Sequence, residues 1–216
     1  MIVLGIDGAL GGFSCAVTRD DELLASVDLT GNVALEGGLS AVATALGQAR
    51  VAPAQLARIA VGVGPGGFTG LRIALSYAKS LAQAWKKPLV GISSFDALEA
   101  DVRVEPPLLT VVQGRTGVVS VRLRTARGER RESGYIAAVL DALAGDFGES
   151  LAVLGAPEDV LAALGERQIH VHRIDRLVEP AAAAVAQIAA GREPAPSLHA
   201  LRADYGELPA AKVPKL

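Results

Sequence analysis

A glycine-rich segment is the densest group of chemically informative residues in the chain. It lies between an apolar run and a helical pattern and reads Gly62-Val63-Gly64-Pro65-Gly66-Gly67-Phe68-Thr69-Gly70-Leu71-Arg72. Glycines at a strand-to-helix turn can aim backbone amides at an anion, with Thr69 as a candidate N-cap. They can equally serve a tight turn and close helix-to-sheet packing. The segment lacks the lysine and following hydroxyl residue of a P-loop, so that kind of nucleotide site is excluded.

Candidate metal ligands and nucleophiles are few, and the first 169 residues contain no histidine. His170 and His172 share one face of a predicted strand and could share a metal, but no third ligand is placed beside them, which favours a surface pair. Cys15 lies in a strand pattern without a nearby histidine and is expected to be a small buried thiol. Ser93 and Ser94 are expected to cap a helix rather than act as nucleophiles.

The composition indicates a folded, soluble protein. The 216 residues are 50% hydrophobic and 20% charged, and 21 basic residues face 23 acidic ones for a net charge of −2. This balance excludes a disordered charged tail and a strongly basic nucleic-acid binder. A single cysteine permits no internal disulfide, which suits a reducing compartment. With no signal peptide and no apolar run near the roughly 20 residues of a membrane span, the chain is expected in the cytoplasm.

Apolar periodicity predicts alternating strands and helices in the first hundred residues. Continuous apolar runs predict strands, and apolar residues recurring every three or four positions predict helices. The predicted elements are strands at 2–6, 13–18 and 22–28, a helix at 33–49, a strand at 58–63, a helix at 71–85, a strand at 89–92 and a short helix opening at 93–96.

A similar order restarts after a charged link. The second set comprises strands at 108–113, 118–125 and 129–134, a helix at 135–144, a strand at 151–154, a helix at 157–164, a strand at 169–174 and a helix at 179–190. Two half-size α/β units fit this repeat better than one doubly wound sheet. The chain therefore divides into a lobe at 1–100, a link at 101–107, a smaller lobe at 108–192 and a proline-containing tail at 193–216.

The glycine-rich segment and its continuation resemble the signature of the TsaB (YeaZ) family, the bacterial partner subunits in tRNA threonylcarbamoyladenosine synthesis. The resemblance covers roughly residues 1–100 and rests on Ile6-Asp7, Gly64 to Ile73, Ala78-Lys79-Ser80-Leu81-Ala82 and Pro88 to Ser94. It implies the two-lobed actin/Hsp70/sugar-kinase (ASKHA) fold with duplicated β-β-β-α-β-α units. It also implies a non-catalytic activating or dimerisation subunit.

The resemblance further implies the partners of the chain. It would pair with a TsaD-like catalytic subunit, work with a TsaE-like ATPase, and reach tRNA only through the complex that modifies adenosine 37 (t6A37). A homodimer is also allowed. No cofactor is expected in this chain alone, whereas ATP or ADP and a metal are expected in the TsaD-containing complex. The alternative is a small-molecule kinase or ATPase of the same superfold; a metalloprotease fails for lack of ligands.

Several positions depart from the family pattern where this superfold ordinarily meets phosphate and metal. Gly67 stands in place of a serine, Gly8-Ala9 in place of Thr-Ser, and Gln113-Gly114-Arg115 in place of Asp-x-Arg. Asp7 and Gly8 would then form a vestigial nucleotide site, with Asp7 capping the turn. The TsaD relatives hold a metal through a His-x-x-x-His pair on the first helix, and the helix at 33–49 has no histidine, so no metal is expected there.

Small residues recur every four positions on the two long predicted helices, and such stripes let helices approach closely. The resemblance implies that these helices pair with TsaD or with a second copy. The hypothesised interface comprises Gly37, Leu39, Ala41, Val42, Ala45 and Leu46 on the first helix and Leu71, Ala74, Leu75, Ala78 and Ala82 on the second. The alternative is that both stripes pack on the chain's own sheet.

Five arginines cluster in the predicted second-lobe hairpin, at positions 122, 124, 127, 130 and 131. Arg122 and Arg124 share a strand face and could touch tRNA phosphates in the assembled complex. A solvated edge that discourages strand pairing is the more common role of such a row.

Overall fold

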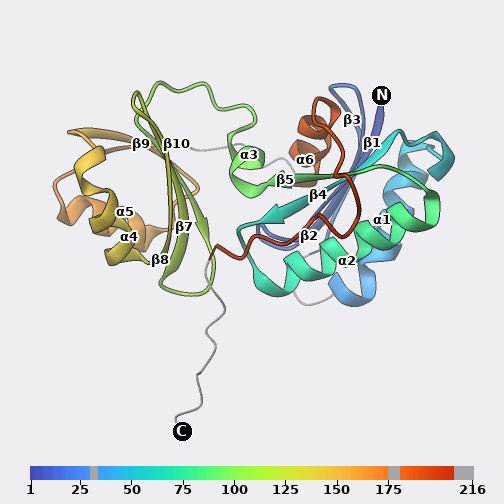
Figure 1. Cartoon of the computed structure of the whole chain (residues 1–216), viewed down its shortest axis with the longest axis horizontal. Helices are drawn as coiled ribbons and strands as arrows, with labels where there is room; N and C mark the ends of the chain where they lie inside the picture. Colours follow the sequence, from blue (N-terminus) through green and yellow to red (C-terminus); the bar gives the residue numbers. More distant parts are fainter. Residues whose placement is uncertain (30–33, 175–180, 207–216) are drawn as a thin grey trace, which may run out of the picture.

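The computed structural model describes residues 1–29, 34–174 and 181–206 and shows two lobes side by side (Figure 1). Each lobe is built on a five-stranded sheet, with strand order β3-β2-β1-β4-β5 in the first and β10-β9-β6-β7-β8 in the second. Both sheets place an antiparallel three-strand meander beside two parallel strands. The predicted duplicated element order is confirmed.

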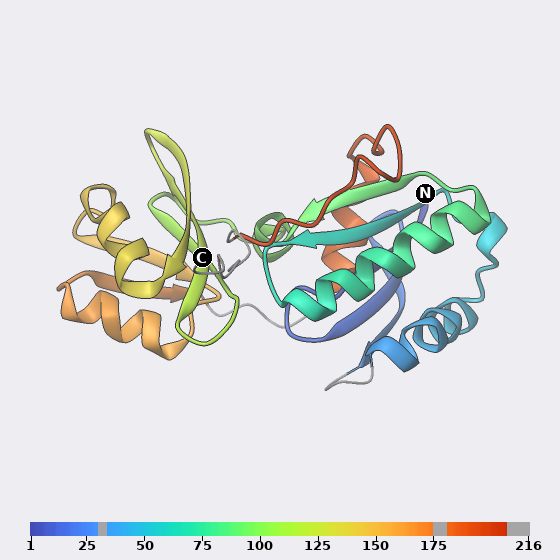
Figure 2. The same cartoon turned by 60° about the horizontal axis from the view of Figure 1, so that its bottom comes forward.

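The first lobe has two layers of helices around its sheet. Its elements are β1 (Ile2–Asp7), β2 (Phe13–Arg19), β3 (Glu22–Leu29), α1 (Ala34–Ala49), a 3-10 turn (Pro53–Gln55), β4 (Arg58–Gly64), α2 (Phe68–Trp85), β5 (Leu89–Ser93) and α3 (Ser94–Glu99). Figure 2 shows the helices of this lobe packed around its sheet. Because side chains alternate across a strand, β1 presents Leu4 and Ile6 to α1 and α2 and presents Val3 to the opposite layer. Residue 33, the predicted start of the first helix, lies outside the described residues.

The second lobe packs its helices on one face of the sheet. Its elements are β6 (Leu108–Gln113), β7 (Val118–Thr125), β8 (Gly128–Tyr135), α4 (Ile136–Leu143), a 3-10 turn (Ala144–Asp146), β9 (Ser150–Leu154), α5 (Glu158–Glu166) and β10 (His170–Ile174). Leu140, Phe147 and Leu164 pack with the inward side chains of β6 and β7 in a separate apolar core. None of the helices in the described ranges is long and apolar enough to cross a membrane.

The last helix, α6 (Ala181–Ala190), packs on the first lobe. The division at 108–192 placed it in the second lobe, and the structure corrects this placement; the first residues of that predicted helix, 179 and 180, lie outside the described ranges. α6 packs on this sheet because the residues that face each other across the contact are small. A Cβ on Gly5 of β1 would lie 2.1 Å from the carbonyl oxygen of Ala182, so glycine facing alanine lets the helix lie close to the sheet. Ser14 of β2 accepts a hydrogen bond from the Ala182 amide at 3.2 Å.

The described part of the proline-containing tail, residues 193–206, runs along the first lobe toward the second (Figure 1). The Ala195 amide donates to the Leu89 carbonyl at 2.8 Å, and the Asp204 amide donates to the Val63 carbonyl at 2.7 Å. Leu201 joins the first-lobe core. The tail therefore extends the packing of β5, the edge strand of the first sheet, while residues 207–216 lie outside the described ranges.

A buried ion-pair network around α3 joins the two lobes. Arg122 of β7 is 5% exposed and donates to Asp96 Oδ1 at 2.6 Å and to Glu99 Oε1 at 3.0 Å. Arg124 Nε lies 2.9 Å from Glu99 Oε2, and the Thr110 hydroxyl also donates to Glu99. Burial disfavours the Arg122 cation, but hydrogen bonds to the two carboxylates outweigh burial and raise its pKa.

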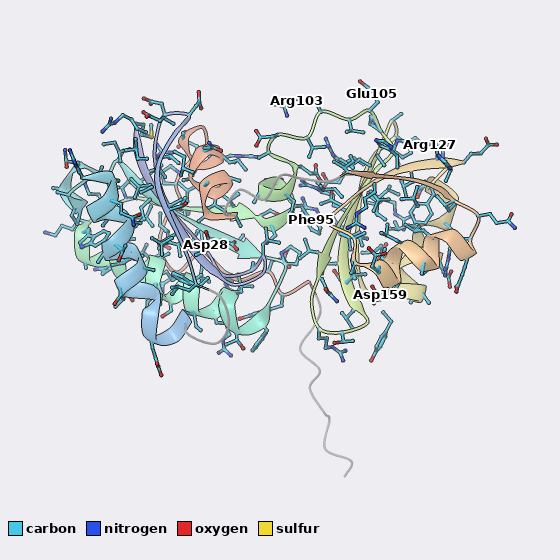
Figure 3. The ribbon with its side chains drawn as sticks, turned by 180° about the vertical axis from the view of Figure 1, so that it is seen from behind. Asp28, Phe95, Arg103, Glu105, Arg127 and Asp159 are labelled. Carbon is cyan, nitrogen blue, oxygen red and sulfur yellow. The ribbon has the colours of Figure 1, made fainter. Side chains whose placement is uncertain are left out.

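Phe95 lies inside this network at the junction of the lobes (Figure 3). The guanidinium carbon of Arg122 is 5.3 Å from the centroid of the Phe95 ring, and that of Arg131 is 5.7 Å away. The ring thus adds a cation–π contact to the ion pairs across the same junction.

The hypothesis of a tRNA-facing arginine row is wrong for Arg122, whose side chain is buried between the lobes. Three of the other members pair with carboxylates, and Arg124 contacts Glu99. Arg130 pairs with Glu132 and Asp146, and Arg131 pairs with Glu129. Only Arg127, at the outer end of the hairpin (Figure 3), has no ion pair among the described residues.

Arg122→Leu is expected to lower the free energy of unfolding by about 2–3 kcal/mol, because Asp96 and Glu99 lose the buried cation that they share. The contacts of Arg192 with Asp96 and of Arg124 with Glu99 remain in the variant. Arg130→Gln is the matched control: its side chain is 47% exposed, and its loss should destabilise the fold much less than the loss of Arg122. Urea unfolding followed by circular dichroism measures both. Equal, small losses would show that the junction does not depend on Arg122.

Candidate functional site

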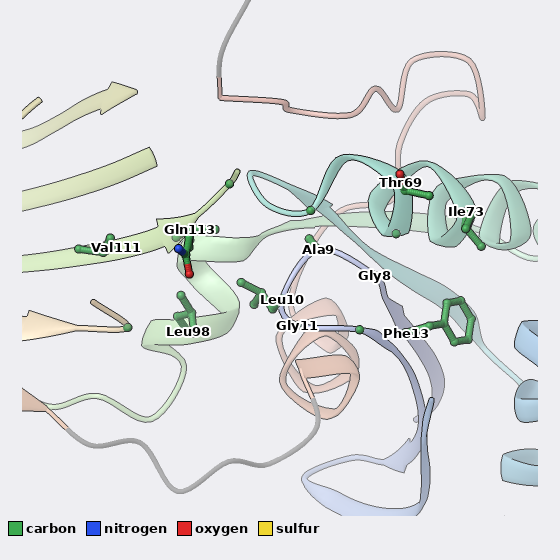
Figure 4. A pocket seen from close by; sticks show the side chains of 16 residues that line it. Gly8, Ala9, Leu10, Gly11, Phe13, Thr69, Ile73, Leu98, Val111 and Gln113 are labelled. Carbon is green, nitrogen blue, oxygen red and sulfur yellow. The ribbon is translucent and has the colours of Figure 1, made fainter. Parts of the chain in front are cut away.

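A cavity of about 850 Å³ lies between the two lobes (Figure 4). The first lobe lines it with residues 8–13 of the β1–β2 loop and with Thr69 and Gly70 at the start of α2. The other wall comes from Leu98 of α3 and from residues 111–114 at the end of β6. The cavity is therefore bounded by the carboxyl ends of strands in both lobes, where α/β folds commonly bind ligands.

Glycines bring the β1–β2 loop against the start of α2. A Cβ on Gly8 would lie 2.2 Å from the Gly70 carbonyl oxygen, and a Cβ on Gly70 would lie 2.2 Å from that of Gly8. Gly66 has a φ of +154°, and a Cβ there would lie 2.2 Å from the Ala9 carbonyl oxygen. Of the two predicted roles of the motif, close packing is confirmed.

The backbone amides of the motif offer fewer free donors to an anion than the sequence predicted. The Gly67 amide donates to the Ala9 carbonyl at 3.0 Å, so this donor is engaged within the chain. α2 begins at Phe68 with Gly67 as its N-cap and no side-chain cap. The predicted N-cap role of Thr69 is therefore wrong, and Thr69 lines the cavity instead.

Asp7 caps the β1–β2 loop, as expected. Its Oδ2 accepts hydrogen bonds from the amides of Ala9 and Leu10 at 3.0 Å each, and its Oδ1 lies against Gly62 with no hydrogen-bond partner in the described structure. Burial raises the pKa of the Asp7 carboxyl to about 6, although the two amides act in the opposite direction. Asp7 is 1% exposed and does not line the cavity.

The lining residues do not fit a magnesium-bound triphosphate. Within the described ranges, the side chains that line the cavity are neutral, and the polar ones are Thr69 and Gln113. Sites that hold phosphate and magnesium use cationic side chains, carboxylates and free backbone amides. No group of three or more histidine, cysteine or acidic residues suited to a metal occurs in the part of the chain that the structure describes.

A family model described as TsaD, tRNA N6-adenosine threonylcarbamoyltransferase, matches residues 36–146, just over half of the chain. The chain belongs to this family. TsaB, a tRNA threonylcarbamoyladenosine biosynthesis protein of Bacillus subtilis (strain 168), is 33% identical over 105 residues, which cover 48% of this chain and 45% of that protein. The family model and this relative confirm the predicted TsaB (YeaZ) resemblance.

A second relative of this TsaD-family chain is a tRNA N6-adenosine threonylcarbamoyltransferase of Protochlamydia amoebophila (strain UWE25). It is 32% identical over 147 residues, which cover 56% of this chain and 43% of the transferase. The chain therefore spans less than half the length of these two relatives.

Solved structures show the fold. A Pseudomonas aeruginosa protein with similarity to peptidase YEAZ superposes with a TM-score of 0.69 at 19% identity, covering 95% of this chain and 99% of that one. An ROK hexokinase from Thermus thermophilus superposes with a TM-score of 0.51 at 14% identity, covering 87% and 97%. The predicted two-lobed ASKHA fold is confirmed.

The predicted interface residues are mostly buried in this chain. Nine of them are at most 8% exposed: Ala41, Val42, Ala45, Leu46, Leu71, Ala74, Leu75, Ala78 and Ala82. These nine side chains pack against the chain's own sheet, as the alternative predicted, and they are not available as an interface. Gly37 is half-buried and Leu39 is 50% exposed. The small residue Gly38 serves an internal contact, since a Cβ there would lie 2.3 Å from the Tyr77 ring.

The remaining candidates lie outside the cavity. His170 and His172 are exposed on β10, an edge strand, as the surface-pair prediction had it. Cys15 is buried, and its burial raises the pKa of the thiol to about 12. Ser93 is the N-cap of α3 and accepts from the Phe95 amide at 3.3 Å.

The raised pKa of Asp7 predicts a pH dependence of stability. The folded state binds this proton more tightly than the unfolded state, so the contribution is present at low pH and is lost as pH rises through about 6. The wild-type chain should therefore gain about 1 kcal/mol more than Asp7→Asn between pH 7 and pH 5. Urea unfolding of both proteins at the two pH values measures this difference, and identical pH dependence would contradict the assignment.

Proposed function

We propose that the chain is a non-catalytic activating subunit of the t6A37 synthesis complex and pairs with a TsaD-like catalytic subunit. The observation that carries this proposal is a TsaD-family chain whose inter-lobe cavity is lined, in the described residues, by glycines and neutral side chains. Sites that hold phosphate together with a metal use charged side chains as well as free backbone amides at such a cleft. ATP or ADP and the metal then belong to the TsaD-containing complex, and this chain contributes a binding surface.

The outer face of α1 is the proposed docking surface for the TsaD-like subunit. Leu39 is 50% exposed there and is one of five large hydrophobic side chains exposed by 36% or more in the described ranges. An exposed apolar side chain on a well-packed helix offers a partner area to bury without disturbing the core. A homodimer would use the same face and compete with the heterodimer. A TsaE-like ATPase and tRNA would join the assembled complex in the cytoplasm.

The alternative is a small-molecule kinase or ATPase, which the fold likeness to the hexokinase motivates. The site weighs against it. The Gly67 amide and both amides facing Asp7 are engaged within the chain, and the carboxylate itself lies outside the cavity.

Leu39→Glu is expected to weaken the complex with a TsaD-like subunit from the same genome by at least about tenfold, because it places a charge in the buried centre of an interface. Arg127→Glu is the control: it also changes charge at an exposed site, but on the second-lobe hairpin. Size-exclusion chromatography with light scattering and titration calorimetry measure the complex. Absence of any complex at micromolar concentrations would contradict the proposed function.

A further inference from the structure

Three exposed aromatic rings and two arginines lie next to residues that line the inter-lobe cavity. Phe68 is 54% exposed, and the guanidinium carbon of Arg72 lies 5.1 Å from its ring centroid. The Tyr205 ring is 4.9 Å from the Phe68 ring and tilted by 36°, and Tyr205 is 36% exposed. The first lobe therefore carries two aromatic rings in contact and one guanidinium cation at this place.

The second lobe carries the matching pair. Tyr135 is 62% exposed, and the guanidinium carbon of Arg115 lies 5.5 Å from its ring centroid. Arg115 itself is exposed in the turn between β6 and β7. Each lobe thus presents an exposed aromatic ring with a guanidinium group beside it.

The two pairs flank the same cavity. Phe68 lies between Gly67 and Thr69, which both line the cavity from the first lobe, and Arg115 follows Gly114, which lines it from the second. The amino end of α2 and the β6–β7 turn lie on either side of the gap between the lobes in both views (Figures 1 and 2). We call Phe68, Arg72, Tyr205, Tyr135 and Arg115 the rim platform.

The chemistry of the rim platform suits unpaired nucleobases. Every base has a π-face that stacks on an aromatic ring or a guanidinium, and arginine adds charge complementary to phosphate. Three of the five large hydrophobic side chains that are exposed in the described ranges belong to the platform. These side chains are divided between the two lobes and do not form the contiguous apolar core that a protein partner would bury. The near-neutral chain charge favours stacking over charge as the source of affinity.

We propose that the rim platform binds a single-stranded segment of RNA by stacking its unpaired bases across the mouth of the cavity. The choice of RNA rests on the proposed function, since the substrate of the proposed complex is a tRNA. The experiment below also shows whether the same surface binds a protein partner instead.

The test uses the full chain and a fluorescein-labelled ten-nucleotide RNA of mixed, GC-containing sequence, alone or annealed to its complement, with binding followed by fluorescence anisotropy. The single strand is expected to bind at least about tenfold more tightly than the duplex, and Phe68→Leu and Tyr135→Leu should each weaken it by about tenfold. With Arg72 near a phosphate, the slope of log K against log salt should be about −0.7. Arg127→Gln is the control for charge at an exposed site, and it should bind as the wild type does.

Equal affinity of the wild type and both platform variants, or a preference for the duplex, would overturn the proposal. So would platform variants that bind RNA normally but lose a TsaD-like subunit, because that result would make the surface a protein interface. Platform variants that lose RNA and keep the TsaD-like subunit would support it. If the chain binds the single strand through the platform but no TsaD-like subunit, the proposed function fails and the platform stands.

Discussion

Arg122 holds the two lobes together, and the shape of the cavity depends on that contact. The side chain belongs to β7 of the second lobe, while its partners Asp96 and Glu99 belong to α3 at the end of the first. A buried arginine with paired carboxylates is costly to break because removal of one partner leaves the other charged and desolvated. Residues of both lobes line the cavity. The ion-pair network fixes the distance between the lobes and thereby the width of the cavity. The tail meets the same junction, since a Cβ on Gly206 would lie 2.1 Å from Ser120 Oγ of β7.

Among the described residues, the side chains that line the cleft are neutral, and the buried carboxylate of Asp7 lies outside it. Asp7 is the carboxylate nearest in sequence to the cavity-lining loop, yet its Oδ2 is engaged by two backbone amides and its burial raises the pKa to about 6. The cavity is lined by glycines, aliphatic side chains, Phe13, Thr69 and Gln113. Electrostatic stabilisation of a transferring phosphoryl group requires donors and cations aimed into such a site. We therefore propose surfaces, at α1 and at the rim platform, as the working parts of the chain.

Much of the fold could be predicted from the sequence because apolar periodicity reports elements directly, and the duplicated order followed from it. The placement of α6 could not, because a helix of alanines carries no signal for which sheet it covers; Gly5 and Ser14, some 170 residues earlier, decide it. The alanine stripes misled for a related reason. Small residues every four positions permit close approach to any neighbour, and here that neighbour is the chain's own sheet. Arg122 looked like part of a surface row because strand alternation cannot reveal that the first lobe covers this face of β7.

The most direct test of the central claim, that this cleft is not built for a magnesium-bound nucleotide, is titration calorimetry of the isolated chain with ATP and Mg²⁺. The account predicts no binding up to about 1 mM ATP, the range in which even weak sites give measurable heat. A micromolar dissociation constant, accompanied by release of inorganic phosphate and lost in Gln113→Ala, would contradict it and restore the kinase or ATPase alternative.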